Sequence, residues 1–170
     1  IRFALCAIKS IGRPVVESII EERKLGGRFK SLTDFIERMG GKDVNKRVVE
    51  NLIKAGALDS LGGNRQQFMI AYAGIMDGVA QSQKTMMTGQ LSLFDLVGEE
   101  EKESFQAKLP DVDEYPKELM LSFEKEVLGV YVSGHPLEEY MDRWKKNITA
   151  VTTDFALDEE SGAAKVHDGE

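Results

Sequence analysis

Apolar residues recur at helical spacing through most of the first half of the chain. One stripe lies within residues 1–10 and a second within residues 15–20, so the pattern predicts two helices. The turn between them contains Gly12, which can adopt a positive φ, and Pro14, which suits the first turn of a helix. Because Gly26-Gly27 follows the second stripe, we expect that helix to end there. The pattern therefore predicts a helix, a tight hairpin and a second helix.

Three more helices are expected within residues 31–83. Ser31 and Asn64 each precede a polar partner by three positions, as N-cap residues do, and each stands before an apolar stripe. Another stripe covers residues 44–55 and is followed by Gly56, which can terminate a helix. The positions assigned to the core are Phe35, Ile36, Met39, Val44, Val48, Leu52, Ala55, Met69, Tyr72, Ile75, Met76 and Val79.

Residues 1–83 are therefore predicted to form an all-α, tandem helix–hairpin–helix domain. The periodicity is lost in residues 84–117, which are acidic and contain two prolines, so a flexible linker is expected. Residues 118–147 regain helical spacing and are predicted to form a short helical segment that packs on the first domain. Residues 148–170 are expected to be a linker or the start of another domain. Since the chain begins with Ile1 and its end carries no stop signal, we expect it to be part of a longer protein.

The charge is distributed unevenly along the chain. Residues 1–65 carry 13 Lys or Arg and 8 Asp or Glu, a net charge of +5, whereas residues 66–170 carry 9 and 21, a net charge of −12. A polyanion would be attracted to the first part and repelled by the second. The charge distribution alone leaves open the alternative that surface charge varies along the chain without any relation to a ligand.

The composition narrows the environment of the protein. No apolar run approaches the roughly 18 residues that span a bilayer, so no membrane partner is expected. The single cysteine, Cys6, excludes an intramolecular disulfide and a thiolate metal cluster. A lone buried cysteine suits a reducing compartment, so we expect the protein to be cytoplasmic.

No set of residues in the sequence suits catalysis. The chain lacks paired carboxylates in apolar surroundings, a Ser/His/Asp set, a phosphate loop and metal-ligand spacing. His135 lies in a Gly-His-Pro turn, where a structural role is favoured over a catalytic one. We therefore expect no catalytic residue, no metal and no cofactor within this chain.

The two predicted hairpins are candidates for phosphate binding. A glycine-containing turn that leads into a helix presents free N–H groups and the positive end of the helix dipole. Such contacts recognise phosphates rather than bases, so binding would be independent of sequence. Pro14 removes one donor from the first hairpin, and an ordinary packing hairpin is the alternative. The candidate DNA-binding residues are Lys9, Ser10, Gly12 and Arg13 at the first hairpin and Lys54, Gly56 and Arg65 at the second.

The predicted linker contains a short peptide that suits capture by a protein groove. Its residues are Gln90, Leu91, Ser92, Leu93 and Phe94. The amide of Gln90 offers directional hydrogen bonds, and the three large apolar side chains can fill pockets of a partner. The alternative is that these residues fold back onto the helical domain.

Several blocks of the sequence resemble the tandem helix–hairpin–helix region of the bacterial DNA polymerase III alpha subunit. They are AIKSIG at residues 7–12, FKSLTDF at residues 29–35, the block of residues 45–62, EKEVLGVYVSGHPL at residues 124–137, and Tyr140. The peptide from Gln90 to Phe94 looks like the internal sliding-clamp motif of that family, which lies between the same blocks.

This resemblance implies a non-catalytic part of a replicative polymerase that grips duplex DNA. It implies that the catalytic carboxylates and magnesium ions of the parent enzyme lie before this segment, and that an OB domain begins near residue 150. The implied partners are double-stranded DNA, the beta sliding clamp and the other domains and subunits of the replicase. Two alternatives are a helix–hairpin–helix module of a repair enzyme, which would not explain the clamp peptide, and a structural spacer that binds no DNA.

Overall fold

The computed structural model describes residues 4–42, 44–87, 109–150 and 155. The chain falls into two compact units, residues 1–133 (the hairpin unit) and residues 134–170. Helices and turns make up the described residues, and no strand occurs among them, so the all-α prediction is confirmed. The peptide from Gln90 to Phe94 lies outside the described residues.

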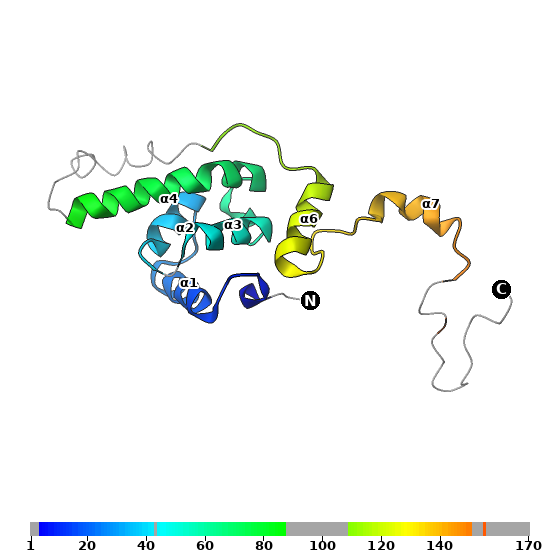
Figure 1. The fold of residues 1–170 in the computed structure, drawn as a ribbon, viewed down its shortest axis with the longest axis horizontal. Coiled ribbons are helices and arrows are strands. Elements are labelled where there is room, and N and C mark those ends of the chain that lie inside the picture. Colours follow the sequence, from blue (N-terminus) through cyan, green and yellow to red (C-terminus); the bar gives the residue numbers. More distant parts are fainter. Residues whose placement is uncertain (1–3, 43, 88–108, 151–154, 156–170) are drawn as a thin grey trace. The chain divides into compact units, whose positions relative to one another are not determined.

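The described elements of the hairpin unit are short 3-10 turns and α-helices. They are η1 (Leu5–Ala7), α1 (Arg13–Gly26), α2 (Leu32–Met39), α3 (Lys46–Lys54), η2 (Asp59–Leu61), α4 (Arg65–Met87) and α6 (Lys117–Leu128). The long helix α4 lies across α2 and α3, as Figure 1 shows. Helix α1 packs against α2, and α6 packs against α3. The helices therefore enclose one core.

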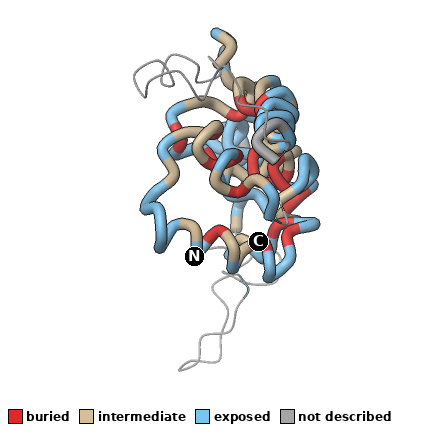
Figure 2. Tube along the Cα trace, turned by 90° about the vertical axis from the view of Figure 1, so that its left-hand side faces the viewer, coloured by how far each residue is buried: buried red, intermediate tan, exposed pale blue. Residues whose placement is uncertain are grey.

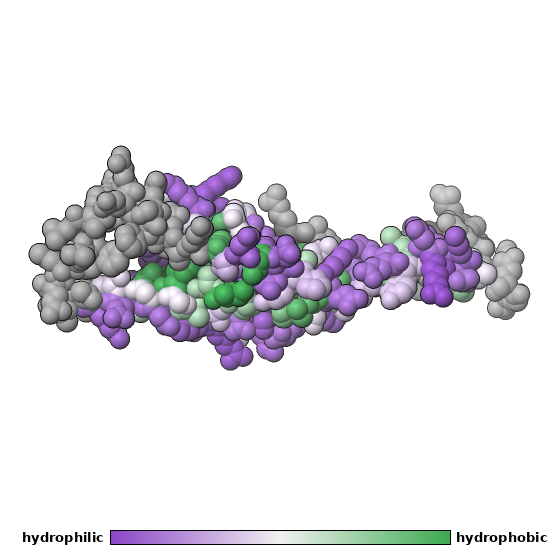
Figure 3. All heavy atoms as spheres, turned by 90° about the horizontal axis from the view of Figure 1, so that it is seen from above, coloured by the Kyte–Doolittle hydropathy of each residue, from purple (hydrophilic) through white to green (hydrophobic). Residues whose placement is uncertain are grey.

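The core of the hairpin unit lies where these helices meet, and its buried residues appear in red in Figure 2. Phe35, Met39 and Leu52 are buried, as predicted. The sequence interpretation missed Phe68, which is fully buried, because the stripe on α4 was taken to begin at the next residue. Phe68 and Ile75 are seven positions apart and therefore share the inner face of α4. On the face that Figure 3 shows, hydrophobic residues of the hairpin unit gather in a group bordered by hydrophilic ones.

The predicted helix caps are present. The side chain of Ser31 accepts the N–H of Asp34 at 3.1 Å. Asn64 and Gln67 form a reciprocal capping box: the Asn64 side chain accepts the N–H of Gln67 at 2.8 Å, and the Gln67 side chain accepts the N–H of Asn64 at 3.0 Å. These bonds satisfy N–H groups that a helix leaves unpaired in its first turn. Helix α3 has a further cap, at Asn45, that the sequence interpretation did not name.

The first predicted helix is reduced to the turn η1. After it, Ile8 is extended, with φ −76° and ψ 131°. Gly12 does not use its freedom to adopt a positive φ: its φ is −84°, and Ser10 is the residue of this turn with a positive φ, 65°. The N–H of Lys9 donates to the carbonyl of Val127 at 2.8 Å. Contacts with α6 therefore replace the intrahelical bonds that would have continued the helix.

The later helices differ in detail from the pattern. Helix α4 continues to Met87, beyond the predicted end of the first domain at residue 83. On α6 the buried residues are Leu121, Glu124 and Val127, whereas Leu119 is exposed. In the second unit, the described elements are a 3-10 turn, η4 (Glu138–Tyr140), and the short helix α7 (Met141–Lys145).

Candidate nucleic-acid interface

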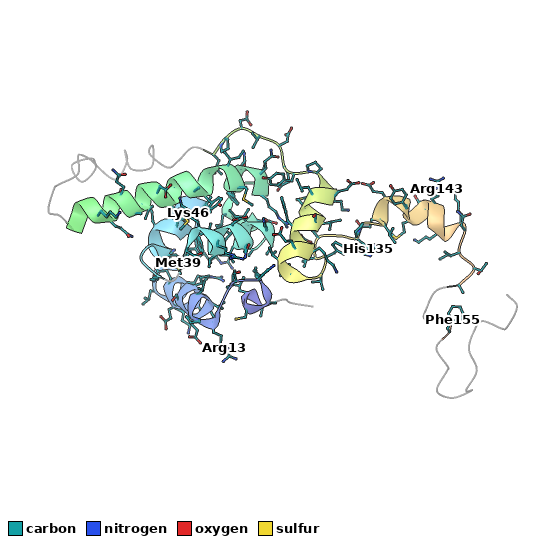
Figure 4. All side chains as sticks on the ribbon, in the orientation of Figure 1. Arg13, Met39, Lys46, His135, Arg143 and Phe155 are labelled. Atoms are coloured by element: carbon teal, nitrogen blue, oxygen red, sulfur yellow. The ribbon has the colours of Figure 1, made fainter. Side chains whose placement is uncertain are left out.

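The turn from Lys9 to Gly12 leads directly into α1 and is open to solvent. Lys9 and Arg13 are exposed, and neither forms an ion pair with any residue that the structure describes. Figure 4 shows Arg13 pointing away from the ribbon. The N–H groups of Gly12, Arg13 and Val15 have no partner among the described residues. Donors at the positive end of a helix, with two cations beside them, form a surface that suits an anion.

The backbone of this turn is held from behind. Asn51 is almost fully buried in α3, and its side-chain amide donates to the carbonyl of Lys9 at 2.6 Å. The N–H of Lys9 donates to Val127 on α6. These two bonds fix the peptide groups on both sides of Lys9 and hold Ser10 in its left-handed conformation. These bonds restrain the backbone of the turn, and restraint of a binding segment lowers the entropic cost of binding.

The second hairpin connects α3 to α4, and its predicted cations are already paired. The ammonium of Lys54 contacts Glu50 at 3.0 Å and Glu126 at 3.2 Å. It also lies 5.5 Å from the centre of the Phe123 ring. Although burial lowers the pKa of Lys54, the hydrogen bonds to Glu50 and Glu126 raise it above its ordinary value. The charge of Lys54 is therefore offset within the protein.

Arg65 is directed into the hairpin unit. Its side chain is 6% exposed and pairs with Asp59 at 2.9 Å and with Glu124 at 3.0 Å. Gly56 has φ 71°, and a side chain there would collide with the guanidinium of Arg65 and the carboxylate of Asp59. Of the residues predicted to bind DNA at the second hairpin, Gly56 thus makes room for an internal ion pair, and Arg65 belongs to that pair.

Glu124 is the buried centre of this network. Its side chain has no exposed surface. One carboxylate oxygen accepts from Arg65, and the other accepts the N–H groups of Val132 and Ser133 at 2.7 and 2.9 Å. Burial raises the pKa of Glu124, but these bonds outweigh it and hold the pKa below its ordinary value of 4.5. A glutamate within a charged run of a helix gives no sequence signal of such a role.

The start of α4 is occupied by a carboxylate of the same chain. Glu114 accepts the N–H of Arg65 at 2.9 Å and the N–H of Gln66 at 3.2 Å. It also accepts the N–H of Tyr115 at 2.8 Å. Two of the free donors that an anion would need at the second hairpin are therefore taken. The sequence interpretation had placed this residue in the linker and assigned it no function.

The two hairpins thus differ, although the sequence predicted the same chemistry for both. The structure brings together Lys9, Ser10, Gly12 and Arg13 on an exposed turn. It brings together Lys54, Gly56 and Arg65 as well, but in a network that faces inward. Asn51, Glu114 and Glu124 are the polar residues that the sequence interpretation missed.

Comparison with known proteins places this arrangement in a family. The family model described as "Helix-hairpin-helix motif" matches residues 1–68. The DNA polymerase III subunit alpha of Saccharopolyspora erythraea is 44% identical over 142 residues, and that of Vibrio cholerae is 39% identical over 144 residues. These matches cover 81% and 85% of this chain and 12% of each relative. In Xylella fastidiosa the subunit is 35% identical over 170 residues, 100% of this chain and 14% of the relative.

This chain belongs to the DNA polymerase III alpha subunit family. It spans about one eighth of the length of these relatives. The helix-hairpin-helix match covers α1, α2 and α3 and ends in the first turn of α4, so it contains both hairpins.

Other kinds of site are not built into the described part of this chain. Within it, no group of three or more His, Cys, Asp or Glu side chains is placed to hold a metal ion. No helix in the described ranges is both long and apolar enough to cross a membrane. A cavity of about 150 Å³ lies beside α4 and is lined mainly by apolar side chains, among them Ile36, Met39 and Met76. It therefore offers packing space and not a polar site.

Proposed function

We propose that this chain is a non-catalytic region of a bacterial DNA polymerase III alpha subunit that binds duplex DNA and docks the sliding clamp. The observation that carries the proposal is the first hairpin: Lys9 and Arg13 are exposed beside unpaired N–H groups at the start of α1. The family of the chain and its helix-hairpin-helix match support a role in DNA replication. For the whole protein we propose DNA-directed DNA synthesis with magnesium, carried out by residues outside this chain.

Duplex binding at the first hairpin would be electrostatic. A backbone phosphate would accept the N–H groups of Gly12 and Arg13, while the side chains of Lys9 and Arg13 lie close enough in sequence to neutralise the neighbouring charge. None of these groups is placed to recognise a base edge, so the contact would be independent of sequence. Such independence suits an enzyme that must hold whatever duplex it has just made.

Clamp docking would involve Gln90, Leu91, Ser92, Leu93 and Phe94. Gln90 follows the last residue of α4, Met87, by three positions, and three residues of chain span at most about 11 Å. The clamp would therefore be held close to the end of α4. Simultaneous binding of clamp and duplex would retain the polymerase far longer than either contact alone, because the second contact becomes intramolecular.

The duplex-binding part of the proposal is tested with the double variant Lys9→Glu, Arg13→Glu. We expect affinity for a short duplex to fall at least tenfold at low salt, and the slope of log K against log salt to decrease by about two, because two phosphate contacts are lost. Fluorescence anisotropy over a salt series gives both quantities.

A matched control is the double variant Arg23→Glu, Lys24→Glu, which reverses two exposed cations at the opposite end of the same helix. It should change the salt slope by less than one contact. Equal losses in the control and in Lys9→Glu, Arg13→Glu would show that net charge alone governs binding. Failure of the unmodified chain to bind duplex would favour a structural spacer.

A further inference from the structure

Residues 109–116 form an ordered segment (the strap) that crosses the start of α4 and is held there by several contacts. The capping-box residues provide two of them: the side-chain amide of Asn64 donates to the carbonyl of Val112 at 2.8 Å, and that of Gln67 donates to the carbonyl of Pro110 at 2.9 Å. The two side chains therefore cap α4 with their oxygens and bind the strap with their nitrogens.

The apolar end of the strap is fitted to the core. Leu109 packs against the core cluster that contains Phe68. A side chain at Gly63 would meet Leu109 at 2.7 Å and the Phe68 ring at 2.5 Å, so glycine at this position permits the close approach. Together with the hydrogen bonds, this contact fixes Glu114 over the start of α4 without relying on the carboxylate itself.

The carboxylate of Glu114 takes the place that a phosphate would occupy at a helix start. Its two oxygens accept successive amides, Arg65 at 2.9 Å and Gln66 at 3.2 Å, which is the arrangement that a phosphate adopts at the positive end of a helix. Asp111 and Asp113 add exposed negative charge on the same strap. A DNA strand that approached this hairpin would meet repulsion instead of free donors.

We propose that Glu114 is an internal substitute for a DNA phosphate, which closes the second hairpin and confines phosphate binding to the first. This inference rests on the proposed duplex binding and adds which of the two hairpins makes the phosphate contact. With two open hairpins the duplex could engage either one in turn, whereas one open hairpin fixes a single register of the protein on the DNA.

The test is duplex binding by Glu114→Gln, which keeps the size of the side chain and removes its charge. We expect binding about two- to fivefold tighter than that of the unmodified chain, since the negative charge that repels a phosphate from the start of α4 is removed and the neutral amide is more easily displaced. The salt slope should increase by about one contact. Asp113→Asn is the control, because it removes one charge from the same strap without touching α4.

A second readout is the amide NMR signals of Arg65 and Gln66. They should stay unchanged when duplex is added to the unmodified chain and should shift when it is added to Glu114→Gln. If the unmodified chain binds duplex and Glu114→Gln binds no more tightly than Asp113→Asn, the inference is overturned and the proposed function stands. If neither the unmodified chain nor the variant binds duplex, the proposed function and the inference both fail.

Discussion

At position 124 a carboxylate with no exposed surface receives one donor from Arg65, 59 positions away, and two from Val132 and Ser133, which follow α6. Burial of a charge is costly unless it is paired and fully hydrogen-bonded. Arg65, Val132 and Ser133 meet this condition for Glu124. The bonds of Glu124 to these three residues therefore connect α4, α6 and the segment after α6. They stabilise the hairpin unit only while the Glu124 carboxylate is charged.

The variant Glu124→Gln should lower the free energy of unfolding by about 2–4 kcal/mol at pH 7, because it leaves Arg65 without a charged partner in a buried place. Chemical denaturation at several pH values measures the effect. Because the pKa of Glu124 is lowered in the folded state, its contribution is complete above about pH 4.5 and is lost as the pH falls through the folded pKa. The difference between the two proteins should shrink below pH 4.5.

Glu118→Gln is the matched control for that experiment, since it changes an exposed carboxylate on the same helix. It should alter the free energy of unfolding by less than about 1 kcal/mol. A Glu124→Gln protein as stable as this control at pH 7 would contradict the role given to the buried network.

At the scale of the elements, the connection between α3 and α4 contains a glycine, Gly56, that the structure explains without a ligand contact. Gly56 was predicted to approach DNA, but the structure gives it two internal reasons to be glycine. Its φ is 71°, and the guanidinium of Arg65 lies where a side chain would be. Gly62, at the other end of the same connection, has φ 79°, and no atom lies within 4 Å of the point that its Cβ would occupy. A comparison of substitutions at the two positions therefore separates the cost of steric crowding at Cβ from the cost of a positive φ.

We expect Gly56→Ala to be more destabilising than Gly62→Ala by about 1–3 kcal/mol, because only the first must displace the Arg65–Asp59 pair. Both variants share the cost of a left-handed alanine, about 1 kcal/mol. Thermal and chemical unfolding of the two proteins gives the comparison. Duplex affinity of folded Gly56→Ala should equal that of the unmodified chain; a selective loss of affinity would restore Gly56 to the DNA contact.

Local features of these elements could be predicted from the sequence, and contacts between them could not. Ser31 and Asn64 were identified because the residues that form a helix cap lie only three positions apart in the sequence. Glu114 and Arg65 lie 49 positions apart, and Glu124 and Arg65 lie 59 apart. Polar pairs at such separations follow no periodicity. The first hairpin and Ser10 were predicted, but the positive φ of Ser10 was not, since the neighbouring peptide groups bond to Asn51 and Val127, both distant in sequence.

At the scale of the whole molecule, the proposed function divides the chain between two ligands. The first hairpin offers cations and free N–H groups, whereas the net charge of −12 on residues 66–170 repels nucleic acid. The proposed clamp peptide, residues 90–94, lies in that acidic part of the sequence, so the proposal gives it a protein partner and not DNA. Since the chain spans about one eighth of its relatives, the two contacts would serve catalysis that takes place elsewhere.

The clamp contact is tested by titrating this chain with purified bacterial beta clamp. We expect binding in the micromolar range, as is typical when a short segment must be ordered on binding, and its loss in Gln90→Ala, Phe94→Ala. Calorimetry supplies the affinity, and Ser92→Ala serves as a control that keeps the apolar residues. Absence of binding by the unmodified chain would leave the peptide without its proposed partner.

The central claim is that duplex DNA binds at the first hairpin and does not bind at the second. Amide NMR of the isotope-labelled chain, recorded while a short duplex is added, tests it residue by residue. We expect the signals of Ser10, Gly12, Arg13 and Val15 to shift, while those of Arg65 and Gln66, bonded to Glu114, stay in place. Shifts at Arg65 and Gln66 with none at the first hairpin would contradict the claim.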